Sequence, residues 1–419
     1  MAILTLALKS LWNRRLTAVL TVLAIAVSVM LLLGVEKVRT GAKSSFANTI
    51  AGTDLIVGAR SGATQLLLYS VFRIGNATNN ISWASYRRIT RHPDVAWALP
   101  LSLGDSHRGY RVLGTTAAYF DHYRYGRRQN LAFEAGKPFE DLYDAVLGAE
   151  VAKALDYAMD DPLVITHGLG AEGFQKHDDK PFRVVGILEP TGTPLDRTIH
   201  ISLEGMEAIH VDWQGGTRVP GLTVSAEEAR QMNLTPKSVT AILIGLKSRF
   251  ATFGLQRQIN EDRREPLLAI LPGVALQEMW DLMGTAEAAL SAISIFVVAS
   301  GLLGMLIMLL AGLGERRREM AILRSVGARP LHIFGLLVAE AALLTLVGAI
   351  LGLALLYAGL TIAQPWIVAE YGLFLPIEAP SNRDLSLLGA VIGAGFLAGA
   401  LPAWKACRQS LADGMIVRM

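Results

Sequence analysis

The chain has 419 residues, of which 52% are hydrophobic and 18% are charged, with a formal net charge of +3 and a mean hydropathy of +0.39. This composition is too apolar for an ordinary soluble protein of this length. The small net charge gives no reason to expect a nucleic-acid partner.

The first residues, 1–15, read MAILTLALKSLWNRR and place Leu4, Leu8, Leu11 and Trp12 on one face of a helix. We predict an amphipathic helix that lies in the inner membrane interface before the first span. A frayed cytosolic tail is the alternative interpretation.

Four segments are apolar and long enough to cross a membrane as helices, namely residues 16–35, 288–313, 331–363 and 385–404. Buried helices of a large soluble core are the alternative, which the lengths disfavour. A signal peptide is a second interpretation of residues 16–35. This segment is long for one, and GVEKVRT after it offers no cleavage site of the small-x-small kind. We therefore expect a retained anchor.

Lysine and arginine predict the orientation of the spans. Basic residues cluster before residue 16, in the segment 314–330 and in the tail 405–419, whereas the short loop 364–384 holds only Arg383. We expect a multi-pass protein of the bacterial inner (cytoplasmic) membrane with both termini and residues 314–330 in the cytoplasm. Residues 36–287 are then a periplasmic domain.

Residues 36–287 alternate short strand-like and helix-like runs, which predicts a large mixed α+β domain inserted between the first and second spans. The strand-like runs are residues 54–59, 110–115, 145–149, 162–168, 182–189, 198–203 and 240–247, and the helix-like runs are 83–93, 149–157, 202–210 and 225–232. Residues 211–222 read as a loop. The single cysteine, Cys407, follows the last span, so the domain has no disulfide and depends on its own core.

The chain lacks the motifs of known catalytic sites. No G-x-x-x-x-G-K-[ST] occurs, so we expect no ATP hydrolysis by a P-loop, no catalytic residue and no cofactor in this chain. Seven of the eight histidines lie between residues 92 and 210, and HDD at 177–179 has donors for a cation. They are widely spread and lack zinc spacing, which favours ordinary surface or core histidines over a metal site.

Within the spans, Glu340 is the main ionisable residue, and we expect structural pairing there rather than a proton relay. Glycine pairs at Gly348 and Gly352, Gly389 and Gly393, and Gly395 and Gly399 have small-xxx-small spacing. They predict close helix packing, in a tight bundle or a dimer.

The segment GLGERRREMAILRSVGARP, residues 312–330, predicts a short helix over 315–326. Met320, Leu323 and Val326 share one face of it. Gly327 is a helix stop, and Pro330 begins the third span. An apolar ridge flanked by charges fits a groove on another protein or a surface of anionic lipid; the interleaved glutamates and Gly327 favour the protein.

This segment resembles the coupling-helix signature of the MacB/FtsX-type permeases, the mechanotransmission (type VII) ABC transporters. Residues 131–155, 183–209 and 401–410 are similar to further elements of the family, and one span before the outer domain with three after it is the family's layout. The tail LADGMIVRM departs from the family's usual ending.

The resemblance implies that two copies of the chain, as a homodimer, pair with two copies of a separate cytosolic ABC ATPase that binds ATP and Mg. The residues that match the coupling motif are Glu315, Arg316, Glu319, Leu323, Arg324, Gly327 and Ala328, with Met320 on the same apolar face. Membrane lipid and a periplasmic adaptor or substrate-binding protein are further expected partners.

Three functions remain open at this point. The first is the permease of an exporter or extractor of a periplasmic or inner-leaflet cargo. The second is an FtsX-like regulator that activates a periplasmic cell-wall hydrolase. The third is a membrane-anchored metal-binding or sensor protein that needs no ATPase. The large outer domain resembles the MacB side of the family more closely.

Overall fold

A computed structural model of the chain describes residues 2–126, 128–168, 175–214, 217–219, 223–315, 317–371, 375 and 377–408. The chain divides into two compact units. The helical unit comprises Met1–Gly41, Gly284–Pro365 and Leu375–Met419, and the sheet unit comprises Ala42–Met283 and Trp366–Phe374.

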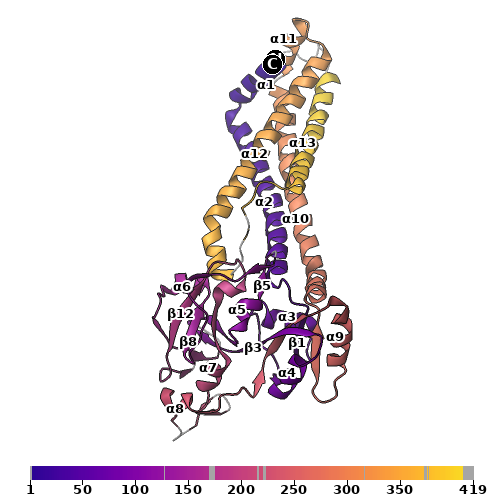
Figure 1. Cartoon of the computed structure of the whole chain (residues 1–419). Helices are drawn as coiled ribbons and strands as arrows, with labels where there is room; N and C mark the ends of the chain where they lie inside the picture. Colours follow the sequence, from indigo (N-terminus) through magenta and orange to yellow (C-terminus); the bar gives the residue numbers. More distant parts are fainter. Residues whose placement is uncertain are drawn as a thin grey trace. The chain divides into compact units, whose positions relative to one another are not determined.

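Long apolar helices make up the helical unit (Figure 1). It contains α1 (Ala2–Asn13), α11 (Arg317–Ser325) and α13 (Asn382–Arg408), and the larger parts of α2 (Arg15–Thr49), α10 (Pro272–Glu315) and α12 (Pro330–Tyr371). Among the described residues, four stretches are long and apolar enough to cross a membrane: Arg15–Phe46, Pro272–Leu313, Pro330–Ile367 and Asn382–Arg408. Each contains one of the predicted spans.

The helices are longer than the predicted spans. Helix α2 continues past residue 35 to Thr49, because residues 36–49 contain no proline and a glycine with positive φ follows only at Gly52, where φ is +82°. Helix α10 likewise begins at Pro272, where proline suits the first helical position. Both helices therefore extend beyond their apolar segments.

The sheet unit is built on a mixed sheet of 12 strands within the described residues, with the main order β18-β1-β17-β3-β4-β13-β8-β12-β7. Its strands are β1 (Leu55–Ala59), β3 (Val95–His107), β4 (Tyr110–Thr115), β7 (Phe133–Gly136), β8 (Asp144–Leu147), β9 (Pro162–Leu163), β10 (Thr166–His167), β11 (Gln175–Lys176), β12 (Phe182–Leu188), β13 (Thr198–Ser202), β17 (Ala241–Leu246) and β18 (Leu267–Ile270). Strand β13 pairs in parallel with β4, and β12 with β8; the other pairs in this sheet are antiparallel.

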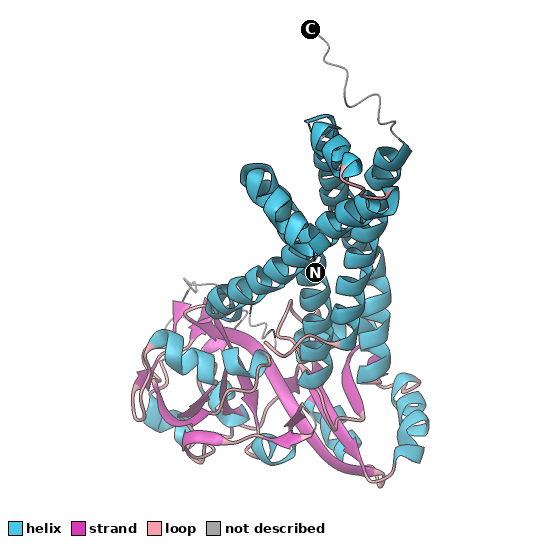
Figure 2. Ribbon diagram, turned by 90° about the horizontal axis from the view of Figure 1, so that it is seen from above, coloured by secondary structure: helices cyan, strands magenta, loops and turns pink. Residues whose placement is uncertain are grey.

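Three small ladders accompany the sheet, formed by β2 (Ile81–Ser82) with β16 (Ser238–Val239), β5 (Arg124–Tyr125) with β6 (Gln129–Asn130), and β14 (Trp213–Gln214) with β15 (Thr217–Arg218). The helices of this unit are α3 (Ala63–Ser70), α4 (Trp83–Thr90), α5 (Ala118–His122), α6 (Ala149–Leu155), η1 (Pro194–Arg197), α7 (Leu203–Ala208), α8 (Ala226–Arg230), η2 (Arg249–Ala251) and α9 (Thr252–Asn260). Figure 2 shows the magenta strands running through the unit with short cyan helices beside them.

Most predicted elements of this unit are confirmed, including the strands at β1, β4, β8, β12, β13 and β17 and the helices at α4, α6, α7 and α8. The prediction of one strand over 162–168 was wrong, because the structure has two short strands there, β9 and β10, that pair with different neighbours. The predicted loop 211–222 lies partly outside the described residues, and its described part contains the β14–β15 ladder.

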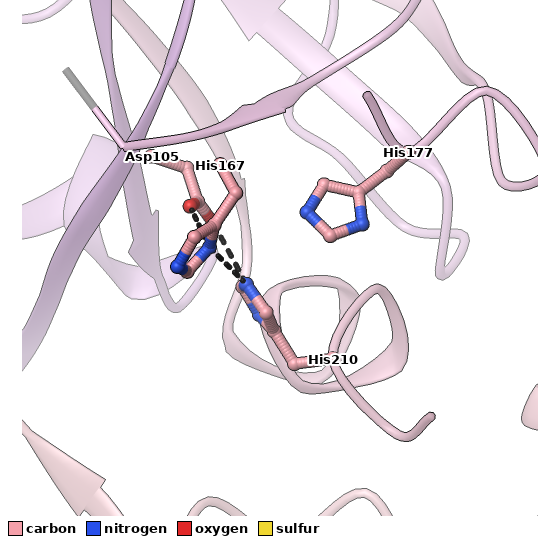
Figure 3. A group of neighbouring side chains, drawn as sticks. All are labelled: Asp105, His167, His177 and His210. Carbon is pink, nitrogen blue, oxygen red and sulfur yellow. Dashed lines mark hydrogen bonds and ion pairs between the residues drawn. The ribbon is translucent and has the colours of Figure 1, made fainter. Parts of the chain in front are cut away.

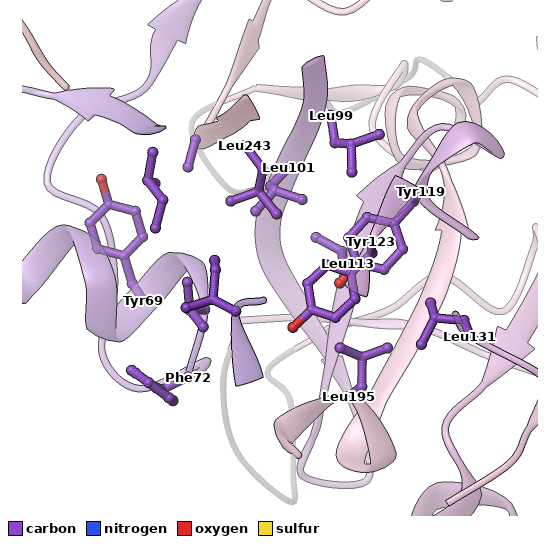
Figure 4. Packing of buried hydrophobic residues seen from close by; sticks show 14 of the residues in the cluster. Tyr69, Phe72, Leu99, Leu101, Leu113, Tyr119, Tyr123, Leu131, Leu195 and Leu243 are labelled. Carbon is purple, nitrogen blue, oxygen red and sulfur yellow. The ribbon is translucent and has the colours of Figure 1, made fainter. Parts of the chain in front are cut away.

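Aliphatic and aromatic side chains fill the space between the sheet and its helices. One buried cluster joins Leu99, Leu101, Leu113 and Leu243 of the sheet to Tyr69 of α3, Tyr119 of α5 and Tyr123 (Figure 4). A second cluster packs β8, β12 and β13 against α6 and α7. Apolar burial of this extent stabilises the unit without a disulfide.

Candidate functional site

The predicted coupling segment forms α11, a short helix between α10 and α12. Its end is fixed by Gly327, whose φ is +97°. The Gly327 N–H donates to the Arg324 carbonyl at 3.0 Å, and the Ala328 N–H donates to the Leu323 carbonyl at 3.0 Å. This pair of bonds is the Schellman motif, which requires a left-handed residue such as glycine. The predicted stop at Gly327 and the start of α12 at Pro330 are confirmed.

The apolar residues of α11 do not form one exposed ridge, which corrects the prediction. Met320 is only 8% exposed, because it packs in a cluster with residues of the neighbouring spans, among them Leu313, Leu337 and Ala403. Leu323 is half-buried. The exposed apolar side chains are Ile322 at 56% and Val326 at 83%, which lie four residues apart and share a face.

Arg324 is attached to the end of a span. Its guanidinium donates to the carbonyl oxygens of Cys407 at 3.0 Å and Ala406 at 3.5 Å, in the last turn of α13. These carbonyls have no partner within the helix, and a cation near them also favours the helix dipole. Glu319 is exposed and Ala328 is half-buried. Helix α10 ends at Glu315, and Arg316 lies outside the described residues.

Two of the three glycine pairs lie at contacts between helices. A Cβ added at Gly352 would lie 2.6 Å from the Ala26 carbonyl oxygen of α2, and one at Gly348 would lie 2.7 Å from Ile25. Gly395 and Gly399 of α13 face Thr345 and Ala341 of α12 in the same way. A larger residue cannot be accommodated without moving the helices apart.

The third pair, Gly389 and Gly393, has no atom of the described residues within 4 Å of an added Cβ. Among the described residues, nothing covers this side of α13. Glu340, on α12, is 2% exposed, so the main ionisable residue predicted within the spans faces the interior of the unit.

A network of ion pairs, which the sequence analysis missed, joins the other ends of the spans. The Glu36 carboxylate of α2 lies 2.8 Å from Arg39 and 2.6 Å from Arg383 at the start of α13. Arg39 also lies 3.4 Å from Glu287 of α10. A separate pair joins Lys37 to Asp384 at 3.1 Å. The available signal was the presence of opposite charges just outside three of the four apolar segments, 16–35, 288–313 and 385–404.

These contacts give the site no chemistry of its own. Exposed apolar side chains lie on α11, at Ile322, and directly after it, at Val326. The helix is held at two points, by Met320 against the spans and by Arg324 at the end of α13. Ser28 of α2 additionally donates to the Val297 carbonyl of α10 at 3.2 Å. Such an arrangement suits the transfer of movement between a bound partner and a packed helix bundle.

Comparison with known proteins gives two family matches. Residues 18–242 match the MacB-like periplasmic core domain, and residues 291–411 match the FtsX-like permease C-terminal model. The first match alone includes more than half of the chain.

Curated relatives match nearly the whole chain. The macrolide export ATP-binding/permease protein MacB of Azoarcus sp. (strain BH72) is 25% identical over 424 residues, covering 96% of this chain and 57% of the relative. The protein of the same name from Nitrobacter winogradskyi is 23% identical over 422 residues, covering 94% and 58%. This chain thus spans less than two thirds of the length of these relatives.

Among solved structures, the periplasmic region of MacB from Actinobacillus actinomycetemcomitans aligns with a TM-score of 0.34 at 11% identity. The alignment covers 55% of this chain and 94% of that one.

Proposed function

Because this chain belongs to the family of FtsX-like permeases with a MacB-like periplasmic core domain, we propose that it is the membrane subunit of an ABC transporter whose ATPase is a separate cytosolic polypeptide. The curated relatives are named as ATP-binding/permease proteins, whereas this sequence contains no P-loop. We propose that a partner polypeptide supplies the ATPase, which binds ATP and Mg.

The geometry of α11 is the observation that carries this proposal. Ile322 and Val326 are exposed, while Met320 and Arg324 attach the same short helix to the spans. A small apolar face on a firmly held helix suits a groove on a partner protein. We propose that the ATPase binds this face, and that its closure on nucleotide moves α10, α12 and α13 together.

We further propose that two copies of the chain assemble with two copies of the ATPase, with both termini and α11 in the cytoplasm of the bacterial inner membrane. The open glycine pair on α13, Gly389 and Gly393, is available for a second copy. The cargo is a periplasmic or inner-leaflet molecule, and a periplasmic adaptor accepts it.

The interior of the spans supports movement of cargo outside the bilayer. Among the described residues, the buried charged side chains on the four candidate spans are Glu36, Glu340 and Asp384, and two of these are paired at the ends of helices. A path for a polar solute usually has several ionisable groups near the middle of the membrane.

The ATPase partnership is tested with the full chain in lipid nanodiscs and candidate ABC ATPases. We expect wild-type chain to bind one of them and to change its ATP hydrolysis rate. The double variant Ile322→Asp, Val326→Asp should weaken that binding by about 10-fold or more, since each change removes an apolar contact of about 1–2 kcal/mol.

The matched control is Phe250→Asp, which alters an apolar side chain that is 99% exposed in the sheet unit. It should bind and stimulate the ATPase like the wild type. Binding that survives the double variant would refute docking on α11, and failure of every ABC ATPase to bind would refute the transporter assignment.

A further inference from the structure

Four side chains that are far apart in the sequence converge in the sheet unit, namely Asp105, His167, His177 and His210 (Figure 3). One ligand atom from each lies within 4.8 Å of all the others. His167 Nδ1 lies 3.1 Å from an oxygen of Asp105 and 3.2 Å from His210 Nε2. His210 Nε2 lies 3.4 Å from the other Asp105 oxygen.

The sheet register brings the first two residues together. Strand β10 pairs with β3 so that His167 is directly opposite Asp105, and residues opposite each other in an antiparallel pair point to the same face. The Thr166 hydroxyl donates to the Ser106 carbonyl at 2.8 Å and stabilises this short pairing. Asp105 and His167 are therefore positioned by the backbone.

The other two histidines arrive from the neighbouring segments. His210 follows α7, and its Nδ1 lies 2.8 Å from the Met206 carbonyl oxygen. Nδ1 must carry the proton of that bond, so in the neutral ring Nε2 has a lone pair directed at the cluster. His177 follows β11, and its backbone N–H donates to the Ile165 carbonyl at 2.9 Å.

Without a bound ion, the burial of the His177 ring has no explanation. It is 1% exposed, and neither of its ring nitrogens has a hydrogen-bond partner among the described residues. The Asp105 carboxylate is also 1% exposed, and the lone pair of His210 Nε2 faces it. Buried polar atoms are normally satisfied, and a cation between these groups would give a partner to one His177 nitrogen, to the Asp105 carboxylate and to His210 Nε2.

The spacing fits a tetrahedral ion. Zinc lies about 2.0–2.2 Å from histidine nitrogen and carboxylate oxygen, so neighbouring ligand atoms in a tetrahedron are about 3.3–3.6 Å apart. The distance of 3.2 Å between His167 Nδ1 and His210 Nε2 is close to that edge, and each of these nitrogens lies 3.1 or 3.4 Å from one of the two Asp105 oxygens. A set of three imidazoles and one carboxylate disfavours Mg²⁺ and Ca²⁺, which prefer oxygen, and Cu⁺, which prefers sulfur.

We propose that Asp105, His167, His177 and His210 bind one divalent transition-metal ion, with Zn²⁺ the ion that fits best. Four protein ligands make the site structural rather than catalytic, because no coordination position is left for a substrate. The ion joins β3 and β10 to the end of α7 and so fixes this corner of the sheet unit.

The surroundings agree with such a site. The centroid of the Trp213 ring lies 4.5 Å from that of His177 and 5.3 Å from that of His167. The indole ring therefore shields the cluster. The buried Lys180 is paired with Asp179 at 2.7 Å and Asp212 at 3.3 Å, so its charge is compensated. Asp179 is thereby occupied, and the run HDD at 177–179 contributes His177 alone.

The test uses the full chain in detergent, purified with an affinity tag that contains no histidine and stripped of metal with EDTA. Calorimetric titration with Zn²⁺ should give one ion per chain, and the melting temperature should rise on reloading. The variants His177→Ala and Asp105→Asn should each weaken binding by about 100-fold or more, since even contacts outside the ligand shell are worth 10–100-fold. His122→Ala, at an exposed histidine outside the cluster, should bind like the wild type.

Wild-type chain loaded with Co²⁺ provides a second measurement that does not depend on the folding of a variant. A four-coordinate site should give the intense visible absorption of tetrahedral Co²⁺. The proposal is overturned if Zn²⁺ does not bind stoichiometrically, if the two ligand variants bind it as well as the wild type, or if the Co²⁺ spectrum is octahedral. None of these measurements requires an ATPase, so they are independent of the proposed function.

Discussion

A single buried histidine makes the stability of the sheet unit dependent on pH. His200, on β13, is fully buried and packs against the rings of Tyr119 and Phe120, with centroid distances of 5.5 and 5.8 Å. Burial, with a smaller contribution from the charge of Arg73, lowers the pKa of His200 to about 3. The folded chain therefore keeps this imidazole neutral where an exposed histidine would be charged.

We predict that the sheet unit loses stability as the pH falls from about 6.5 toward 3. His200 takes up a proton in the unfolded chain near pH 6.5 but in the folded chain only near pH 3. Protonation of the unfolded chain therefore costs the folded state no stability above about pH 6.5 and an increasing amount below it. The loss is at most about 1.4 kcal/mol per pH unit. Melting temperatures at pH 7 and pH 5 should differ less in His200→Gln than in the wild type. His107 and His177 titrate in both proteins, so they cannot cause a difference between them. Equal pH dependence in the two proteins would therefore contradict the prediction.

At the scale of helices, the glycine pairs are the most constrained positions in the helical unit. Gly348 and Gly352 let α12 approach α2, while Gly395 and Gly399 let α13 approach α12. Helix α12 thus has a close neighbour on two sides. These close contacts leave no room for larger side chains there, whereas Gly389 and Gly393 have space.

We predict opposite outcomes for two identical substitutions. Gly352→Ala places a methyl group 2.6 Å from the Ala26 carbonyl oxygen and should destabilise the unit by about 1–3 kcal/mol through overpacking. Gly304→Ala, on α10, meets no atom of the described residues and should be neutral or gain up to about 1 kcal/mol from helix propensity. Thermal unfolding in detergent measures both. Equal effects would show that α2 and α12 do not approach as described.

Local patterns predicted most elements but missed the longest strand. Strand β3 was not predicted because Pro100 and Gly104 normally interrupt strands, yet β3 tolerates both, with a register shift toward β4 between Leu103 and Ser106. Asp105 lies in this strand. The cluster around it was therefore not foreseeable from sequence spacing, which favoured ordinary histidines.

The same limit applies to the coupling segment. Helical periodicity placed Met320 with Leu323 and Val326 on one ridge, and the Schellman stop at Gly327 was predicted correctly. Whether a residue on that ridge is exposed depends on α12 and α13, which follow later in the chain. Tertiary contacts of this kind leave no trace in the local pattern.

At the scale of the whole molecule, ion pairs connect three of the spans at the end opposite α11. Glu36 of α2 contacts Arg383 at the start of α13, and Arg39 of α2 contacts Glu287 of α10. Glu36 is 8% exposed. Pairs that are partly shielded from water are screened less than surface pairs, so they can keep the helix ends together.

We predict that Glu36→Gln lowers the stability of the helical unit by about 1–2 kcal/mol, because Arg39 and Arg383 lose their shared carboxylate. It should also reduce the change in ATP hydrolysis that the chain causes in the proposed ATPase partner, without weakening the proposed binding of that partner at α11. Melting temperature and ATPase rate in nanodiscs measure the two effects. Glu261→Gln removes an exposed pair with Arg257 and serves as control. An unchanged ATPase response would show that this network of ion pairs takes no part in coupling.

The attachment of α11 at two points has a mechanical consequence. A flexible loop between α10 and α12 would transmit only tension, because it would fold when pushed. Here Met320 is buried against the spans and Arg324 is bound to the last carbonyls of α13, so α11 resists bending and compression as well. A partner bound at Ile322 and Val326 would therefore act on the bundle in both directions of its cycle, when it closes and when it reopens.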